Sequence, residues 1–171
     1  ARVLAVTNIV GSQATREAEG VLFTRAGLEI GVAATKTFLA QVLAMLLLAL
    51  HLAHERGHLS IDQVRGYTEE LRHAPATLED YLNSEAVSRV AEVAKRYAKS
   101  SYIMCLGRKV SLPVAMEGAL KLKEISYVPT EAYAAGEMKH GPIALLDEGT
   151  PVLVVATDSP VYDQLISNVQ E

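Results

Sequence analysis

The stretch Tyr102-Ile103-Met104-Cys105-Leu106, followed by Gly107-Arg108 and then by Pro113, decides the fold class of this chain. Its first five residues form a continuous apolar run, which is typical of a strand buried on both faces of a parallel sheet. Gly107-Arg108 predicts a turn. Because proline is accepted in the first turn of a helix, we expect a helix from Pro113 to about Ser126. The stretch therefore predicts a strand-turn-helix unit of an α/β fold.

Similar patterns extend on both sides of this unit. Apolar runs predict buried strands at residues 3–7, 21–24 and 151–156. Helices are expected from Thr35 to Arg56, from Ser60 to a point before Pro75, from about Ser84, and after Ser159-Pro160, with an extended segment from Tyr127 to Tyr133. This order predicts a parallel sheet. Because no strand interrupts the helices between residues 35 and 98, we expect two sheets, one on each side of a helical connection near residue 58.

Both ends of the pattern look truncated, since the first strand has no preceding strand-helix unit and the helix cut off at Glu171 has no following strand. The segment after Ala1 does not resemble a signal peptide. The apolar stretch Phe38–Ala53 is shorter than the roughly 20 residues of a membrane span, so we expect a buried core helix and not a membrane anchor.

The composition is that of an ordinary soluble globular protein, with 50% apolar and 21% charged residues and a net charge of −4. The sequence has no Lys/Arg cluster of the kind that binds nucleic acid. Cys105 is the single cysteine, so no disulfide forms within the chain, which fits a reducing cytoplasm. We expect Cys105 to be a buried, inert thiol, and we find no metal-ligand set.

Three charged residues of the helix predicted after Pro113 lie on one stripe. Glu117, Lys121 and Glu124 are spaced four and three residues apart. One interpretation is a solvated face with weak ion pairs, and pattern alone favours it. The other is a site in which a lysine stands beside a carboxylate base.

Two other segments could carry chemistry. His140 precedes Gly141-Pro142, which predicts a turn, and histidine changes its charge near neutral pH. The small-residue loop at 27–36 opens a long helix, whose N-terminus favours anions. Gly107-Arg108-Lys109 also precedes a helix. An exposed loop histidine and tight loop packing remain the simpler alternatives.

Two long motifs carry a resemblance to a known family. Glu117-Gly-Ala-Leu-Lys-Leu-Lys-Glu-Ile-Ser-Tyr127 and Glu131-Ala-Tyr-Ala-Ala-Gly-Glu-Met-Lys-His-Gly-Pro142 resemble the isomerase half of the glucosamine-6-phosphate synthase family, the isomerising glutamine:fructose-6-phosphate aminotransferases. Glu29-Ile-Gly-Val-Ala-Ala-Thr-Lys36 is similar to a loop of the same family. The resemblance implies flavodoxin-like sugar-isomerase (SIS) subdomains, each a three-layer α/β/α sandwich. Residues 1–57 would be the C-terminal part of the first subdomain, and residues 58–171 the linking helices and most of the second.

The resemblance also implies an activity and its site. The family joins ammonia from glutamine to fructose 6-phosphate and isomerises the product to glucosamine 6-phosphate, without a cofactor. Glu124 would move a proton between C1 and C2, and Lys121 would assist at the sugar oxygens. His140 would open the sugar ring at a neighbouring subunit's site. Val32 and Ala33 would contact the sugar through their backbone. A glutaminase domain and a second copy of the chain, as a homodimer, are the implied partners.

The chain also departs from the family's pattern. Its phosphate-binding loop, its Schiff-base lysine and its glutaminase domain have no counterpart in these 171 residues, so we expect the isolated chain to be inactive. Ala34 and Pro129 differ from the residues usual in the family. Two alternatives stay open, a non-catalytic SIS module that binds sugar phosphates and a structural piece that dimerises through Phe38–Ala53.

Overall fold

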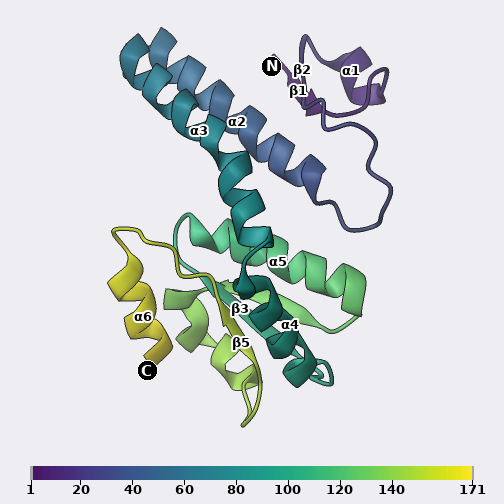
Figure 1. Cartoon of the computed structure of the whole chain (residues 1–171), viewed down its shortest axis with the longest axis vertical. Coiled ribbons are helices and arrows are strands. Elements are labelled where there is room, and N and C mark those ends of the chain that lie inside the picture. Colours follow the sequence, from purple (N-terminus) through teal and green to yellow (C-terminus); the bar gives the residue numbers. More distant parts are fainter. Residues whose placement is uncertain (1, 171) are drawn as a thin grey trace. The chain divides into compact units, whose positions relative to one another are not determined.

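The computed structural model describes residues 2–170, so the predicted ends at Ala1 and Glu171 lie outside it (Figure 1). Its elements are β1 (Leu4–Thr7), α1 (Gln13–Glu17), β2 (Gly20–Phe23), α2 (Lys36–Glu55), α3 (Ile61–Leu82), α4 (Glu85–Tyr97), β3 (Ile103–Gly107), α5 (Ser111–Ser126), β4 (Thr130–Ala134), the 3-10 helices η1 (Ala135–His140) and η2 (Pro142–Leu145), β5 (Val152–Val154) and α6 (Tyr162–Gln170). The chain divides into two compact units between Arg89 and Val90. Each unit contains one of the two predicted sheets.

The first unit contains a two-stranded parallel sheet. β1 pairs with β2 in a register that runs from Leu4–Gly20 to Thr7–Phe23. The short helix α1, which was not predicted, connects the two strands. Since the strands are parallel, their carboxyl ends open at one edge of the sheet, where the loop that leads to α2 begins.

The expectation that the apolar helix α2 is buried is wrong, because Leu50 is its single buried residue within the described chain. In this unit α2 packs against α3 and β1, which cover only part of its circumference. By length and composition α2 could cross a membrane. Core helices of soluble proteins pass the same test, so the helix alone is weak evidence for a membrane.

Helix α3 begins as predicted and ends later than predicted. Ser60 and Gln63 form a reciprocal capping box, in which Ser60 Oγ accepts from the Gln63 N–H and Gln63 Oε1 accepts from the Ser60 N–H. The helix then continues through Pro75 to Leu82. Pro75 is exposed, so water can bond the carbonyl group that the missing N–H leaves free.

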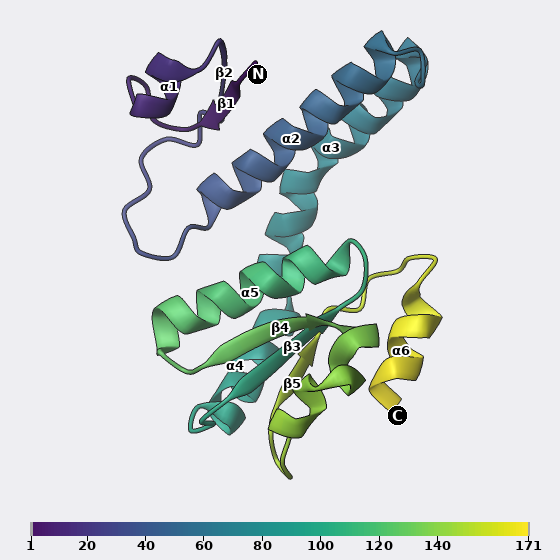
Figure 2. The ribbon, with the colours of Figure 1, turned by 180° about the vertical axis from the view of Figure 1, so that it is seen from behind.

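The second unit is a three-layer α/β structure around a parallel sheet with the strand order β4-β3-β5 (Figure 2). Side chains alternate across β3, which is the central strand. Cys105 faces α5 and packs with Ala115 and Ala119. Met104 and Leu106 point to the opposite face, where Leu165 of α6 and Met138 of η1 complete a second cluster. Both faces of the sheet are therefore covered, as the apolar run predicted, and Cys105 is fully buried.

Gly107 lets the end of β3 approach the start of α5 very closely. A Cβ atom at this position would lie 2.5 Å from the backbone oxygen of Ser111 and 2.6 Å from the backbone of Leu112. The Ser111 hydroxyl accepts from the Arg108 N–H (2.8 Å) and donates to the Arg108 carbonyl (3.0 Å). The turn therefore depends on the missing side chain of Gly107 and on the two hydrogen bonds between Ser111 and Arg108. Together they allow α5 to begin close to the end of β3.

The division between units does not coincide with the predicted subdomain boundary. The predicted boundary at residues 57/58 assigns helix α3 to the second part, whereas α3 packs against α2 in the first unit. The predicted boundary rests on the family resemblance and stays a prediction.

Candidate functional site

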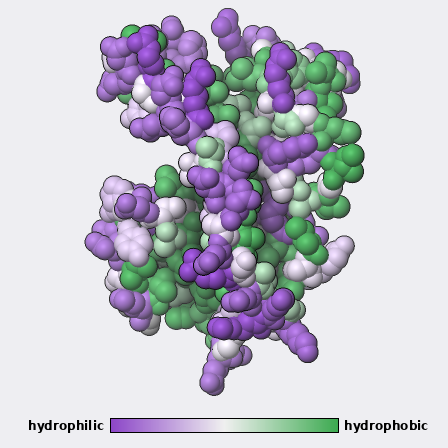
Figure 3. Space-filling view, viewed as in Figure 1, coloured by the Kyte–Doolittle hydropathy of each residue, from purple (hydrophilic) through white to green (hydrophobic). Residues whose placement is uncertain are grey.

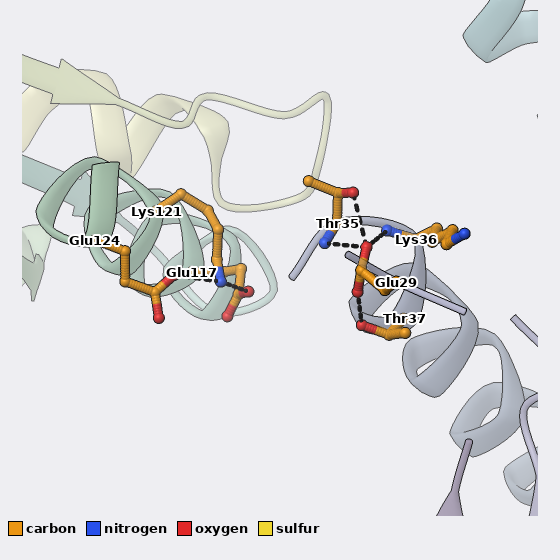
Figure 4. A network of polar contacts seen from close by, with 7 residues as sticks. All are labelled: Glu29, Thr35, Lys36, Thr37, Glu117, Lys121 and Glu124. Carbon is orange, nitrogen blue, oxygen red and sulfur yellow. Dashed lines mark hydrogen bonds and ion pairs between the residues drawn. The ribbon is translucent and has the colours of Figure 1, made fainter. Parts of the chain in front are cut away.

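Three side chains of α5 form a compact charged group. Lys121 Nζ lies 3.0 Å from Glu124 Oε2 and 3.2 Å from Glu117 Oε1 (Figure 4). The three side chains are only 20%, 27% and 23% exposed, respectively. The sequence pattern alone favoured a solvated face, whereas in the structure the three side chains form a partly sheltered cluster.

The cluster has a defined electrostatic asymmetry. The hydrogen bond from Lys121 to Glu124 is the main reason that the pKa of Lys121 is raised, and the contact with Glu117 adds to it, while desolvation opposes it. At neutral pH the lysine is therefore a fixed ammonium between two carboxylates. The helical period places this stripe on the side of α5 away from Ala115 and Ala119, which pack on the sheet. Its side chains therefore point away from their own sheet.

The loop between β2 and α2 contains a second polar network, centred on Glu29 (Figure 4). Glu29 Oε1 accepts from the Thr35 N–H (3.0 Å), the Thr35 hydroxyl (3.0 Å) and the Lys36 N–H (3.1 Å), and Oε2 accepts from the Thr37 hydroxyl. These bonds, that from Thr37 foremost, lower the pKa of Glu29 to about 2. The carboxylate already occupies the N–H groups that open α2, so the chain provides its own anion there.

Val32 and Ala33 lie in this loop, between Glu29 and the start of α2. Val32 is 85% exposed. Within residues 2–170, no hydrogen bond from the rest of the chain engages the backbone N–H groups of Val32 and Ala33. The predicted backbone contact of these two residues with a sugar stays a prediction.

His140 does not join the α5 cluster. It is the exposed last residue of η1 and precedes Gly141, which has a φ of +139°. The expected turn is therefore the end of a 3-10 helix. In the described part of the chain, no hydrogen bond or ion pair links His140 to Glu124 or Lys121. The predicted role at a neighbouring subunit's site stays a prediction.

An open hollow of about 500 Å³ lies at the carboxyl ends of β1 and β2. This edge is where ligands bind in parallel α/β sheets. The hollow is lined by Asn8, Ile9, Val10, Phe23, Arg25, Gly27 and Leu28. Sequence reasoning did not select Asn8 or Arg25, although Asn8 directly follows a predicted strand, and a polar residue at that position was an available signal. Among residues 2–170, no group of three or more His, Cys, Asp or Glu side chains could hold a metal ion.

A third polar group, formed by Tyr102, Glu131 and Tyr133, lies at the edge strand β4. Glu131 Oε2 accepts from the hydroxyl groups of Tyr133 (2.6 Å) and Tyr102 (3.2 Å). Burial, followed by the charge of Glu131, raises the pKa of Tyr102, and the bond to Glu131 raises that of Tyr133. Both phenols therefore stay protonated donors, which suits a structural clasp between β3 and β4.

Comparison with known proteins shows what this chain is similar to. Residues 96–171 match the family model described as SIS domain. Over 98% of its length the chain is 54% identical to the glutamine–fructose-6-phosphate aminotransferase (isomerizing) of Methanosarcina mazei, and over 100% it is 50% identical to that of Thermus thermophilus. The chain spans 27% and 28% of the length of these two relatives.

Solved structures agree with this result. The C-terminal domain of glucosamine-fructose-6-phosphate aminotransferase from Francisella tularensis matches 98% of this chain with a TM-score of 0.92 and 37% identity, over 46% of its own length. A putative phosphosugar isomerase from Silicibacter pomeroyi matches 96% with a TM-score of 0.75 and 31% identity, over 46% of its own length. The resemblance to the isomerase half of the glucosamine-6-phosphate synthase family is thus confirmed.

Proposed function

We propose that this chain is part of an enzyme that converts fructose 6-phosphate and ammonia from glutamine into glucosamine 6-phosphate, and that Glu124 is the base of its isomerising step. The observation that carries the proposal is the pairing of Glu124 with Lys121 on a partly sheltered helix face. A carboxylate is a suitable base for a proton next to an imine, because it can take the proton from C1 and return it to C2. No redox step or cofactor is needed.

The remaining residues have distinct roles in this proposal. The Lys121 ammonium faces sugar oxygens and stabilises negative charge that develops during proton transfer. The free backbone N–H groups of Val32 and Ala33 bind the sugar. His140 is exposed and serves as the acid–base group of ring opening at the site of a second copy in a homodimer. A glutaminase domain supplies the ammonia, and the enzyme works in the cytoplasm.

The test is Glu124→Gln in the full-length product of the gene. We expect glucosamine 6-phosphate synthesis to fall by about 10²-fold or more, because general-base catalysis contributes that much, while glutamine hydrolysis continues. Glu148→Gln, an exposed site in the same unit, is the matched control and should keep both activities. Retained synthesis in the Glu124→Gln protein would remove Glu124 from the mechanism.

A non-catalytic SIS module is the alternative outcome. In that case the wild-type protein binds glucosamine 6-phosphate in a calorimetric titration and yet forms no product from fructose 6-phosphate and glutamine. For the isolated 171-residue chain we expect no turnover, since the phosphate-binding loop and the imine-forming lysine of the family have no counterpart in it.

A further inference from the structure

The loop that carries Val32 and Ala33 is fastened at its beginning by Asn8, the residue that follows β1. Asn8 Nδ2 donates to the Gly27 carbonyl (2.6 Å), and Asn8 Oδ1 accepts from the Ala26 N–H (2.8 Å) and from the Thr24 hydroxyl (3.1 Å). One side chain thus uses both ends of its amide to hold three successive points of a segment 16 to 19 residues away. Gly27, with a φ of +73°, forms the bend at this end.

The same loop is fastened at its other end by Glu29 through the four bonds to Thr35, Lys36 and Thr37 described above. Lys36 Nζ adds a bond to the Leu28 carbonyl (2.7 Å). The segment from 30 to 34 therefore forms an arc with both ends fixed. Gly27 and Leu28, which precede this arc, contribute to the wall of the hollow at the carboxyl ends of β1 and β2.

Hydrophobic burial does not explain the conformation of this loop. Leu28, Ile30 and Val32 are 74%, 90% and 85% exposed, respectively. Apolar colour accordingly lies at the right-hand edge of the space-filling view, where the loop runs (Figure 3). Since exposed apolar side chains contribute little to folding, the polar contacts of Asn8 and Glu29 are what hold the arc in place.

We propose that Asn8 and Glu29 are positioning residues, which hold the loop of residues 24–35 so that the backbone N–H groups of Val32 and Ala33 face a sugar phosphate. The inference rests on the proposed function and extends it to two residues that do not touch the substrate. Holding the arc before binding lowers the entropy loss on binding, so the effect belongs in substrate affinity and not in the proton-transfer step.

The test is Glu29→Gln in the full-length protein, with Glu55→Gln at the other end of α2 as the matched control. Glutamine retains one carbonyl acceptor but loses the charge and the second acceptor oxygen. We expect the KM for fructose 6-phosphate to rise roughly tenfold with kcat nearly unchanged, and hydrogen exchange of the amides in 30–36 to accelerate. Asn8→Ala should give the same pattern, and Glu55→Gln neither change.

Two milder variants keep the test decisive if Glu29→Gln does not fold. Thr37→Val removes a single bond to Glu29, and Glu29→Asp keeps the charge, so both should give smaller changes of the same kind. An unchanged KM, with or without faster exchange, overturns the inference, and so does a loss of kcat at unchanged KM. Wild-type protein that makes no glucosamine 6-phosphate refutes the proposed function instead, and the exchange rates of the variants still report whether Glu29 holds the loop.

Discussion

Lys121 Nζ and Glu124 Oε2 lie 3.0 Å apart on neighbouring turns of α5, on the side of the helix that faces away from the sheet. The side chains of an ordinary surface ion pair are mostly exposed, whereas those of Lys121 and Glu124 are 20% and 27% exposed. Because Glu117 approaches the same ammonium from the preceding turn, two carboxylates share one positive charge. Lys121 therefore offsets the negative charge of Glu117 and Glu124, and its ammonium group has a third N–H beyond the two that face these carboxylates.

Replacing Lys121 with Met should impair catalysis and stability together. The change leaves Glu117 and Glu124 as sheltered carboxylates without their common partner, and unpaired like charges oppose folding. We expect kcat for sugar isomerisation to fall about 10²-fold and the melting temperature to decrease. Lys123→Met, on another face of the same helix, is the control for kinetics and melting. Equal values for the two variants would contradict a role of the cluster.

Between neutral and alkaline pH, the stabilisation by Lys121 should be lost only at high pH. Its pKa in the folded protein is raised above the ordinary value of 10.5, chiefly by the bond to Glu124. A raised pKa means that this contribution is complete below 10.5 and is lost as pH rises through the folded value. The difference in melting temperature between wild type and Lys121→Met should therefore stay constant from pH 7 to 10 and shrink above. A difference that vanishes by pH 9 would be inconsistent with it.

Gly107 and Gly118 provide a matched pair of glycine-to-alanine changes. At Gly107 the new methyl group meets backbone within 2.6 Å, so Gly107→Ala should destabilise the protein by roughly 1–3 kcal/mol. At Gly118, in the middle of α5, nothing lies within 4 Å of the added atom. Gly118→Ala should therefore stabilise by about 0.5–1 kcal/mol through helix propensity. Chemical denaturation measures both, and the same sign for both would refute the close approach of β3 and α5.

Order in the loop before α2 should survive moderately acidic conditions. Glu29 has a pKa of about 2 in the folded chain, below its ordinary value of 4.5. A lowered pKa means that the contribution is present above 4.5 and is lost as pH falls toward 2. In NMR spectra, the amide resonances of Thr35 and Lys36 should shift with a midpoint near 2. A midpoint near 4.5 would mean that the bonds to Glu29 are not formed in solution.

The central strand could be predicted because β3 is short, apolar and covered on both faces. The other apolar runs form strands β1, β2 and β5 as predicted, but their predicted burial is wrong, since Leu4, Phe23 and Leu153 are 47%, 37% and 45% exposed. The run 102–106 and the helix after Pro113 follow from local patterns, and β3 and α5 confirm them. The spacing of Glu117, Lys121 and Glu124 likewise predicted contacts that lie within one helix. Local rules failed at Pro75, which is exposed inside α3, and at α2, whose burial depends on what packs around it.

The contacts that Asn8 and Glu29 make with the loop could not be predicted from the sequence, for a different reason. Asn8 meets Thr24, Ala26 and Gly27 only because β1 and β2 end at the same edge of one sheet. Glu29 meets Thr37 across a bend that no residue period describes. Contacts of this kind depend on the path of the chain in three dimensions.

The single cysteine gives the second unit a built-in reporter. Cys105 is fully buried beneath α5, and desolvation raises the pKa of its thiol, so a thiol reagent has no access to it while α5 stays on the sheet. Any labelling must therefore proceed through an opened form of this unit, and the labelling rate reports how often α5 separates from the sheet. Variants of α5 can be ranked by the rate at which Cys105 is labelled, without a spectroscopic label.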